Sequence, residues 1–145
     1  MTMDWIARGI ASNGNTTLNI DKGANLDINL KDDSNDKYHS GALYLNSGAI
    51  INVAGNLNIV SDGQPYYRST GIDDPVYIGG NSKIDVNGGS FTVNATNMGD
   101  YKGSVVTSAG TSTISINHHG SFQITGDGTA ATGVSLVAGS TFTST

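Results

Sequence analysis

The chain contains no cysteine, no glutamate and only 2 prolines among its 145 residues. The absence of cysteine excludes disulfides and thiolate metal sites. The absence of glutamate removes one of the common acid–base groups for hydrolysis. Charged residues supply only 13% of the chain, the net charge is −5, and no cluster of Lys and Arg is present to bind phosphates. The sequence therefore predicts no nucleic-acid partner.

Long apolar runs are missing as well. No stretch approaches the roughly 18 residues of a membrane span, and residues 1–10 lack the apolar core of a signal peptide. We therefore expect no membrane insertion. The abundant residues are Gly, Asn, Ser and Thr, which occupy 66 positions. This composition suits strands that are closed by many tight turns.

Short triplets that alternate apolar, polar and apolar residues recur along the chain. In every set the second triplet starts 8 residues after the first, and from set to set the second triplet advances by 33, 33, 30 and 28 residues. The alternation is the two-residue period of a strand with one buried face, and no helical period is visible. The five sets begin at Ile10, Leu43, Val76, Val106 and Val134.

Three short strands and three corners make up each repeat, and the corners are too short for helices. We therefore expect an all-β fold, a right-handed parallel β-solenoid (β-helix) with three short strands per coil and about four to five coils. The alternative is an antiparallel sandwich, whose strands would pair through hairpins without a fixed coil period. We expect a single domain over residues 1–145, with residues 1–9 as an N-terminal flank or partial cap. Because the last repeat stops in mid-coil, we expect a fragment of a longer surface protein.

A solenoid predicts that equivalent apolar residues stack in interior columns, with about 4.8 Å between coils. The polar residues between them, from Asn19 and Asn52 to Asp85, Ser115 and Thr143, are expected to face water. The three predicted columns are Ile10–Leu43–Val76–Val106–Val134, Leu18–Ile51–Ile84–Ile114–Phe142 and Leu26–Leu57–Phe91–Phe122.

Repeat length varies almost wholly after the third strand, in residues 31–41, 61–75, 94–104 and 125–133. In a solenoid these loops emerge on one side, and function tends to lie on loops held by a rigid scaffold. Tyrosine offers a flat apolar face and a hydroxyl, which suits sugars and peptides. The candidate ligand-binding residues are the outward Tyr44 and Tyr77 of adjacent first strands and, on the loops, Tyr38, Tyr66, Tyr67, Arg68, Tyr101 and Lys102.

A structural interpretation of the same tyrosines stands beside the functional one. Tyr44 and Tyr77 also fit a cross-strand pair that packs beneath the loops. The loop tyrosines equally fit the role of loop anchors.

The acidic residues are not expected to catalyse a reaction. Neighbouring loop aspartates are usually turn formers or solvated charges, and we interpret Asp73 and Asp74, like Asp32 and Asp33, in this way. A solenoid lyase needs a basic residue close to acidic side chains that hold calcium, and neither Arg8 nor Arg68 is expected beside an acidic cluster on the coils.

No metal site is predicted with any specificity, and no cofactor is expected. Asp32, Asp33 and Asp36 offer carboxylates to calcium, but their spacing does not match an EF-hand loop. The neighbouring His118 and His119 are interpreted as a surface turn, because adjacent side chains point in different directions.

The runs GALYLNSGAIINV (residues 41–53) and VYIGGNSKIDV (residues 76–86) resemble the coil unit of the pectate-lyase-like adhesive domains of Gram-positive cell-surface adhesins, of the type found in lactic acid bacteria. The resemblance covers nearly the whole chain from about Ile10. It implies a secreted parent protein, attached to the cell wall, that binds host or environmental glycans, matrix proteins or neighbouring cells. It carries over no defined binding residues.

The leading hypothesis is therefore a non-catalytic adhesin module that binds its ligand on the loop side, without enzyme activity. One alternative is a self-associating aggregation module whose coil edges pair with another molecule, more strongly in acid, where carboxylates lose their charge below about pH 4. The other is a polysaccharide lyase or hydrolase, or the remnant of one.

Overall fold

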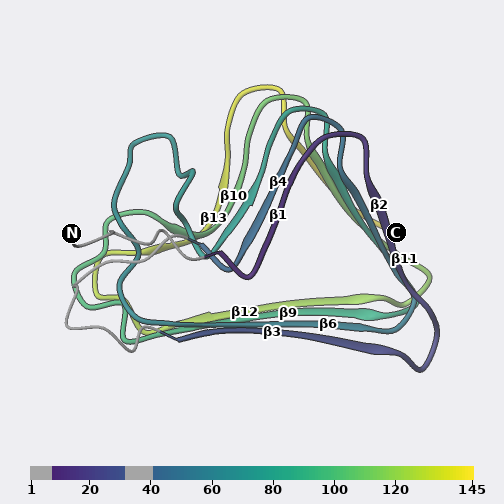
Figure 1. Cartoon of the computed structure of the whole chain (residues 1–145), viewed down its shortest axis with the longest axis horizontal. Coiled ribbons are helices and arrows are strands. Elements are labelled where there is room, and N and C mark those ends of the chain that lie inside the picture. Colours follow the sequence, from purple (N-terminus) through teal and green to yellow (C-terminus); the bar gives the residue numbers. More distant parts are fainter. Residues whose placement is uncertain (1–7, 32–40) are drawn as a thin grey trace, which may run out of the picture.

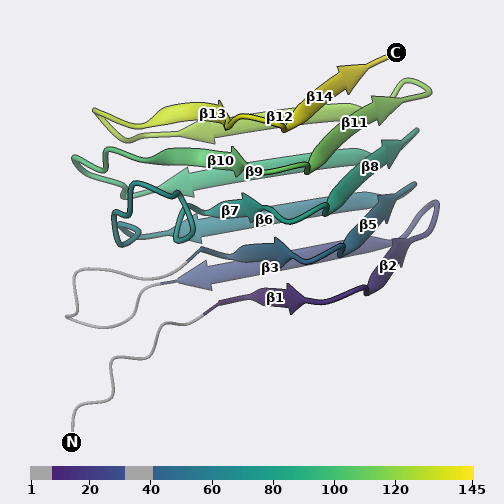
Figure 2. The same cartoon turned by 90° about the horizontal axis from the view of Figure 1, so that it is seen from above.

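The computed structural model describes residues 8–31 and 41–145, in which all regular elements are β-strands. The strands form three parallel sheets along the length of the molecule (Figures 1 and 2). Sheet A contains β1 (Ile10–Asn13), β4 (Leu43–Asn46), β7 (Val76–Ile78), β10 (Ser104–Ser108) and β13 (Thr132–Leu136). Sheet B contains β2 (Thr17–Ile20), β5 (Ile50–Val53), β8 (Lys83–Asn87), β11 (Thr113–Asn117) and β14 (Thr141–Ser144). Sheet C contains β3 (Asn25–Lys31), β6 (Asn56–Asp62), β9 (Ser90–Thr96) and β12 (Ser121–Gly126).

Successive strands along the chain belong to sheets A, B and C in turn, which makes the chain a β-solenoid. Every pairing joins equivalent strands of successive coils and is parallel. The predicted parallel solenoid is therefore confirmed, and the antiparallel sandwich is excluded. In Figure 2 the near strands of sheet A run from left to right while the chain rises from its N-terminus to its C-terminus, so the solenoid is right-handed, as expected.

The three interior columns are confirmed residue by residue. Ile51 lies in register with Leu18 and Ile84, and Leu57 with Leu26 and Phe91. In the middle coils these side chains are fully buried, because each has a neighbouring coil on both sides. At the ends of the stack Leu18 and Phe142 are 37% and 39% exposed, since each has a described coil on one side only.

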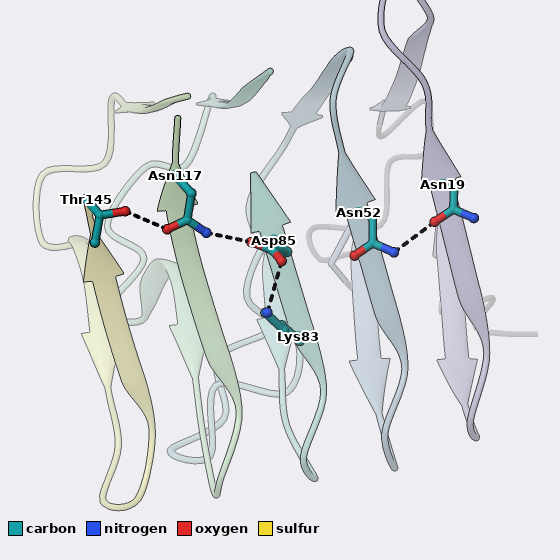
Figure 3. Close-up of polar contacts among 6 residues, drawn as sticks. All are labelled: Asn19, Asn52, Lys83, Asp85, Asn117 and Thr145. Carbon is teal, nitrogen blue, oxygen red and sulfur yellow. Dashed lines mark hydrogen bonds and ion pairs between the residues drawn. The ribbon is translucent and has the colours of Figure 1, made fainter. Parts of the chain in front are cut away.

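Polar side chains form hydrogen-bonded ladders on the outer faces of sheets B and C. On sheet C the Asn58 amide donates to Asp27 Oδ1 at 2.7 Å and accepts from the Thr92 hydroxyl at 2.8 Å. On sheet B the Asn52 amide donates to Asn19 at 2.8 Å (Figure 3). These ladders repeat the coil register on the outside. Not every outward residue faces water as predicted, because the short Ser115 side chain lies between Asp85 and Thr143 in its column and is buried.

Stacked corners explain part of the glycine content. Gly139, between β13 and β14, has a φ of +91°, and a Cβ there would lie 2.8 Å from the carbonyl oxygen of Gly110 in the preceding coil. Only glycine adopts such a conformation readily and also permits this approach. The corner sequence is therefore set by the coil beneath it.

Candidate functional site on the loop face

Three loops leave the solenoid at the edge where sheet C ends and sheet A begins. They are residues 63–75 between β6 and β7, residues 97–103 between β9 and β10, and residues 127–131 between β12 and β13. All three lie on the left in Figures 1 and 2, because the third strand of every coil ends at the same edge. The predicted clustering on one side is confirmed for these three loops, while residues 32–40 of the fourth predicted loop lie outside the described residues. We call this side of the molecule the loop face.

A buried carboxylate ties the first of these loops to the next coil. The two oxygens of Asp74 accept hydrogen bonds from the hydroxyls of Tyr101 and Thr107. Burial raises the pKa of Asp74, although the hydrogen bonds from Thr107 and Tyr101 act in the opposite direction. The sequence interpretation of Asp74 is a turn former or a solvated charge. Its N–H does close a turn by donating to the Gly71 carbonyl, but its side chain is not solvated, because the loop folds it inward against β10.

Asp73 is buried as well and faces both arginines of the chain. Its carboxylate lies 2.6 Å from Nε of Arg68 and 3.6 Å from Nη2 of Arg8. A buried charge is tolerated only when it is paired, and the arginines supply that partner. The sequence interpretation of Asp73 is likewise a turn former or a solvated charge, and solvation is wrong because its side chain is buried. Both arginines lie beside this loop aspartate, whereas the prediction concerned acidic clusters on the coils. Arg8 precedes the first coil and Asp73 the third, so only the winding of the solenoid brings them together.

The contacts of Asp73 and Asp74 with Arg8, Arg68, Tyr101 and Thr107 form one buried network, and Tyr101 is held inside it. The side chain is 1% exposed, its hydroxyl donates to Asp74, and the ring of Tyr67 packs against it edge to face at 6.2 Å. Burial raises the pKa of the Tyr101 hydroxyl, and the hydrogen bond to Asp74 adds to the shift. The structure thus places this candidate binding residue as a loop anchor.

Two glycines make room for the network. A Cβ on Gly41 would overlap the carbonyl oxygen of Asp74, and a Cβ on Gly103 would overlap the Tyr101 hydroxyl and the Asp74 carboxylate. Any larger residue would push the loop away from sheet A. At these two glycines the loop backbone and side chains are in close contact with the coils.

Tyr44 and Tyr77 stack on each other, as the coil register predicts. Their ring centroids are 5.3 Å apart and their planes differ by 13°. The Arg8 guanidinium lies 4.0 Å from the Tyr44 ring centroid, and Asn46 donates to the Tyr44 hydroxyl at 3.2 Å. Tyr44 is consequently only 6% exposed, while Tyr77 is half-buried, and burial raises the pKa of the Tyr77 hydroxyl. This position resembles the packed cross-strand pair more than the wall of an open groove.

The remaining described candidates are exposed, and three of them are consecutive in the chain. Tyr66 and Tyr67 are each 51% exposed, and the Arg68 guanidinium lies 5.4 Å from the Tyr66 ring centroid. Lys102 is exposed next to Tyr101, the residue that Tyr67 contacts. We call Tyr66, Tyr67, Arg68 and Lys102 the loop patch. Tyr38 lies outside the described residues.

Asp127, an exposed residue of loop 127–131, holds the start of loop 97–103 in place. Its carboxylate accepts hydrogen bonds from the backbone N–H groups of Asn97 and Met98 at 2.7 and 3.0 Å. These two bonds, that from Met98 first, lower the pKa of Asp127. The start of loop 97–103 is therefore fastened to the coil that follows it.

Metal binding receives no support from the described part of the chain. No group of three or more His, Asp or Glu side chains there is arranged to hold a metal ion. His118 and His119 form an exposed corner with φ values of +52° and +62°, which confirms the predicted surface turn. Asp32, Asp33 and Asp36, the residues considered for calcium, lie outside the described residues.

The sequence did not predict the buried network around Asp73 and Asp74, because its members lie far apart in the chain. Asp74 stands two residues before the interior Val76, and the equivalent positions of the other coils hold Arg8, Gly41, Ser104 and Thr132. Because charge and size at this position vary from coil to coil, the sequence carries no signal that Asp74 turns inward.

No family model, curated protein or solved structure matches the chain. Across residues 8–31 and 41–145 there is also no helix of the length and hydropathy needed to cross a membrane.

Proposed function

We propose that the chain is a non-catalytic adhesin module that binds a surface glycan or a matrix or cell-surface protein through the loop patch. The observation that carries this proposal is the exposure of Tyr66 and Tyr67, half of whose surface faces solvent on a loop that is tied down from below. The resemblance to pectate-lyase-like adhesive domains supports the same function, and with it a secreted, wall-attached parent protein.

The way in which the loop is held favours binding. Asp73 pairs with Arg68, and Asp74 bonds to the next coil, so both ends of the segment from Arg68 to Asp74 are fastened. Backbone hydrogen bonds from Gly71 to Arg68 and from Asp74 to Gly71 close the turn between them. A loop that is already ordered loses little conformational entropy when a ligand binds.

The chemistry of the patch suits a sugar or a polar peptide surface. The tyrosine rings offer apolar faces with a hydroxyl at one end, while Arg68 and Lys102 offer hydrogen-bond donors to hydroxyl, carbonyl or acidic oxygens. The two adjacent carboxylates of this loop, Asp73 and Asp74, are occupied with arginine, tyrosine and threonine contacts that hold the loop. For this reason we propose binding rather than lyase or hydrolase activity.

The test is an array of glycans and matrix proteins, probed at neutral and mildly acidic pH with calcium present or chelated. We expect a specific signal from the wild-type protein that disappears in the double variant Tyr66→Ala/Tyr67→Ala. The matched control is Gln123→Ala, an exposed polar residue on the outer face of sheet C. A blank array from a folded protein contradicts the proposal, and release of reducing or unsaturated sugar ends would favour the enzyme alternative.

Self-association is the second candidate function, and the apolar surface of the last coil favours it. Leu136, Val137 and Phe142 are among the few large apolar side chains that the described residues expose. Sedimentation velocity over a concentration series tests this candidate. Larger species at higher concentration would support it, and a monomer throughout the series would remove it.

A further inference from the structure

The buried network beneath the loop patch has two branches, each of which leads to one exposed tyrosine. The Arg68 guanidinium lies 5.4 Å from the ring centroid of Tyr66. The ring of Tyr67 packs instead against the ring of Tyr101, with centroids 6.2 Å apart. Tyr66 and Tyr67 are neighbours in the chain, yet these contacts lead to different parts of the solenoid.

The first branch ends on the outer face of sheet A. Nε of Arg68 lies 2.6 Å from one oxygen of Asp73, and Nη2 of Arg8 lies 3.6 Å from the other. The Arg8 guanidinium in turn lies 4.0 Å from the ring centroid of Tyr44 on β4. A planar guanidinium can stack on an aromatic ring while its N–H groups face a carboxylate. The branch therefore runs from Tyr44 through Arg8, Asp73 and Arg68 to Tyr66.

The second branch ends on β10 and uses neither arginine. The Tyr101 hydroxyl donates to one oxygen of Asp74, and the hydroxyl of Thr107 donates to the other. The branch therefore runs from Thr107 through Asp74 and Tyr101 to Tyr67. The two adjacent aspartates of the loop thus serve different tyrosines.

Arg8 supplies the protected charge of the first branch. The Asp73 side chain is 3% exposed, the Arg8 side chain 23% and the Arg68 side chain 51%. Arg68 approaches the carboxylate more closely, but an ion pair with an exposed partner is screened by water and contributes little. A buried carboxylate that loses its protected partner is strongly destabilised. Removal of Arg8 should therefore turn Asp73 toward solvent, and Arg68 would move with it.

We propose that Arg8 is the positioning residue of Tyr66. It holds Asp73 inward against sheet A, and through Asp73 it fixes Arg68 and the face of Tyr66 that the loop patch presents. Tyr67 is set by the second branch and does not depend on Arg8. A residue that precedes the first coil thus controls one half of a site on the loop between the second and third coils.

Tyrosine ring resonances test this inference without a ligand. The full chain with isotope-labelled tyrosine rings is compared by NMR with Arg8→Gln and Thr107→Val, which change the far ends of the two branches. We expect Arg8→Gln to shift the ring resonances of Tyr66 and to leave those of Tyr67 in place. Thr107→Val should do the reverse. The matched control is Lys22→Ala, an exposed cation in the corner between β2 and β3, which should shift neither ring.

The variants Tyr66→Phe and Tyr67→Phe assign the two rings. An unchanged Tyr66 ring in Arg8→Gln, or equal shifts of both rings, overturns the proposal. Loss of the β-sheet circular dichroism spectrum in Arg8→Gln would give Arg8 a purely structural role and would overturn it as well.

A double-mutant cycle extends the test to binding, and this part alone rests on the proposed function. With the strongest array ligand we expect Arg8→Gln to lower the affinity by about 3-fold or more. In the Tyr66→Ala background the same change should have no further effect, whereas in the Tyr67→Ala background the full loss should remain. Equal losses in both backgrounds contradict the role of Arg8. A blank array removes the proposed function, and the ring resonances then decide the inference by themselves.

Discussion

The coils and the loop face of this molecule are held together in different ways. The coils repeat one contact many times, with each apolar side chain stacked on its equivalent in the next coil. The loop face depends on single contacts, among which the pairs formed by Asp73 and Asp74 have no counterpart elsewhere in the described chain. A repeated contact has an equivalent in the other coils, whereas each contact of Asp73 and Asp74 is made once. The coils therefore suit a scaffold, and the loop face suits a site.

Removal of a large interior side chain should have the largest effect, and it should affect the coils. Phe91 is fully buried and stacks on Phe122 with ring centroids 4.9 Å apart. We expect Phe91→Ala to lower the free energy of unfolding by about 3–5 kcal/mol, because a cavity is left between two coils. Urea denaturation followed by circular dichroism measures the change, with the exposed Asn94→Ala as control. A loss below about 1 kcal/mol would mean that the coils can collapse around the gap.

The network beneath the loop should be nearly as sensitive. Asp74→Ala leaves the hydroxyls of Tyr101 and Thr107 buried without their acceptor. Each such group costs about 1–3 kcal/mol, so we expect a total loss of about 2–6 kcal/mol and faster proteolysis within residues 63–75. Limited proteolysis with mass spectrometry locates the cuts. Unchanged cleavage of this loop would show that Asp74 does not hold it.

The pH dependence of this network has a definite sign. Because burial raises the pKa of Asp74 from 3.8, the folded state binds a proton more tightly than the unfolded state does. The stability that this group contributes is therefore complete below pH 3.8 and is lost as the pH rises through the folded pKa. We expect the free energy of unfolding of the wild type, relative to Asp74→Asn, to fall over that window. A difference that rises with pH would contradict the assignment.

Sequence alone predicted the coils far better than the loop face. The columns through Ile51 and Phe91 follow from a period that any five repeats make visible, and their partners always lie one coil away. The pairing of Asp73 could not be predicted, because one of its partners, Arg8, lies two coils away and belongs to no repeated pattern. For Tyr101 the sequence left a binding residue and a loop anchor equally open, because it does not show which loop side chains turn inward. Periodic contacts can be inferred from spacing, and unique ones cannot.

The outer ladders should contribute the least. Asn58→Ala removes the hydrogen bonds to Asp27 and Thr92 on the exposed face of sheet C. We expect a loss below about 1 kcal/mol, because water replaces both partners. Thermal unfolding of Asn58→Ala and of Phe91→Ala under the same conditions compares the two losses of stability directly. A loss as large as that of the interior variant would mean that the ladders, rather than the columns, hold the coils together.

The central claim is that the loop patch is a binding site presented by a rigid scaffold. The most direct test is the affinity of the strongest array ligand for the wild type, for Tyr66→Ala/Tyr67→Ala and for Gln123→Ala. We predict a loss of about 10-fold or more for the tyrosine variant, equivalent to about 1.4 kcal/mol, with the solenoid intact by circular dichroism and with Gln123→Ala unchanged. Equal affinity of all three proteins would contradict the account and move the ligand away from the loop patch.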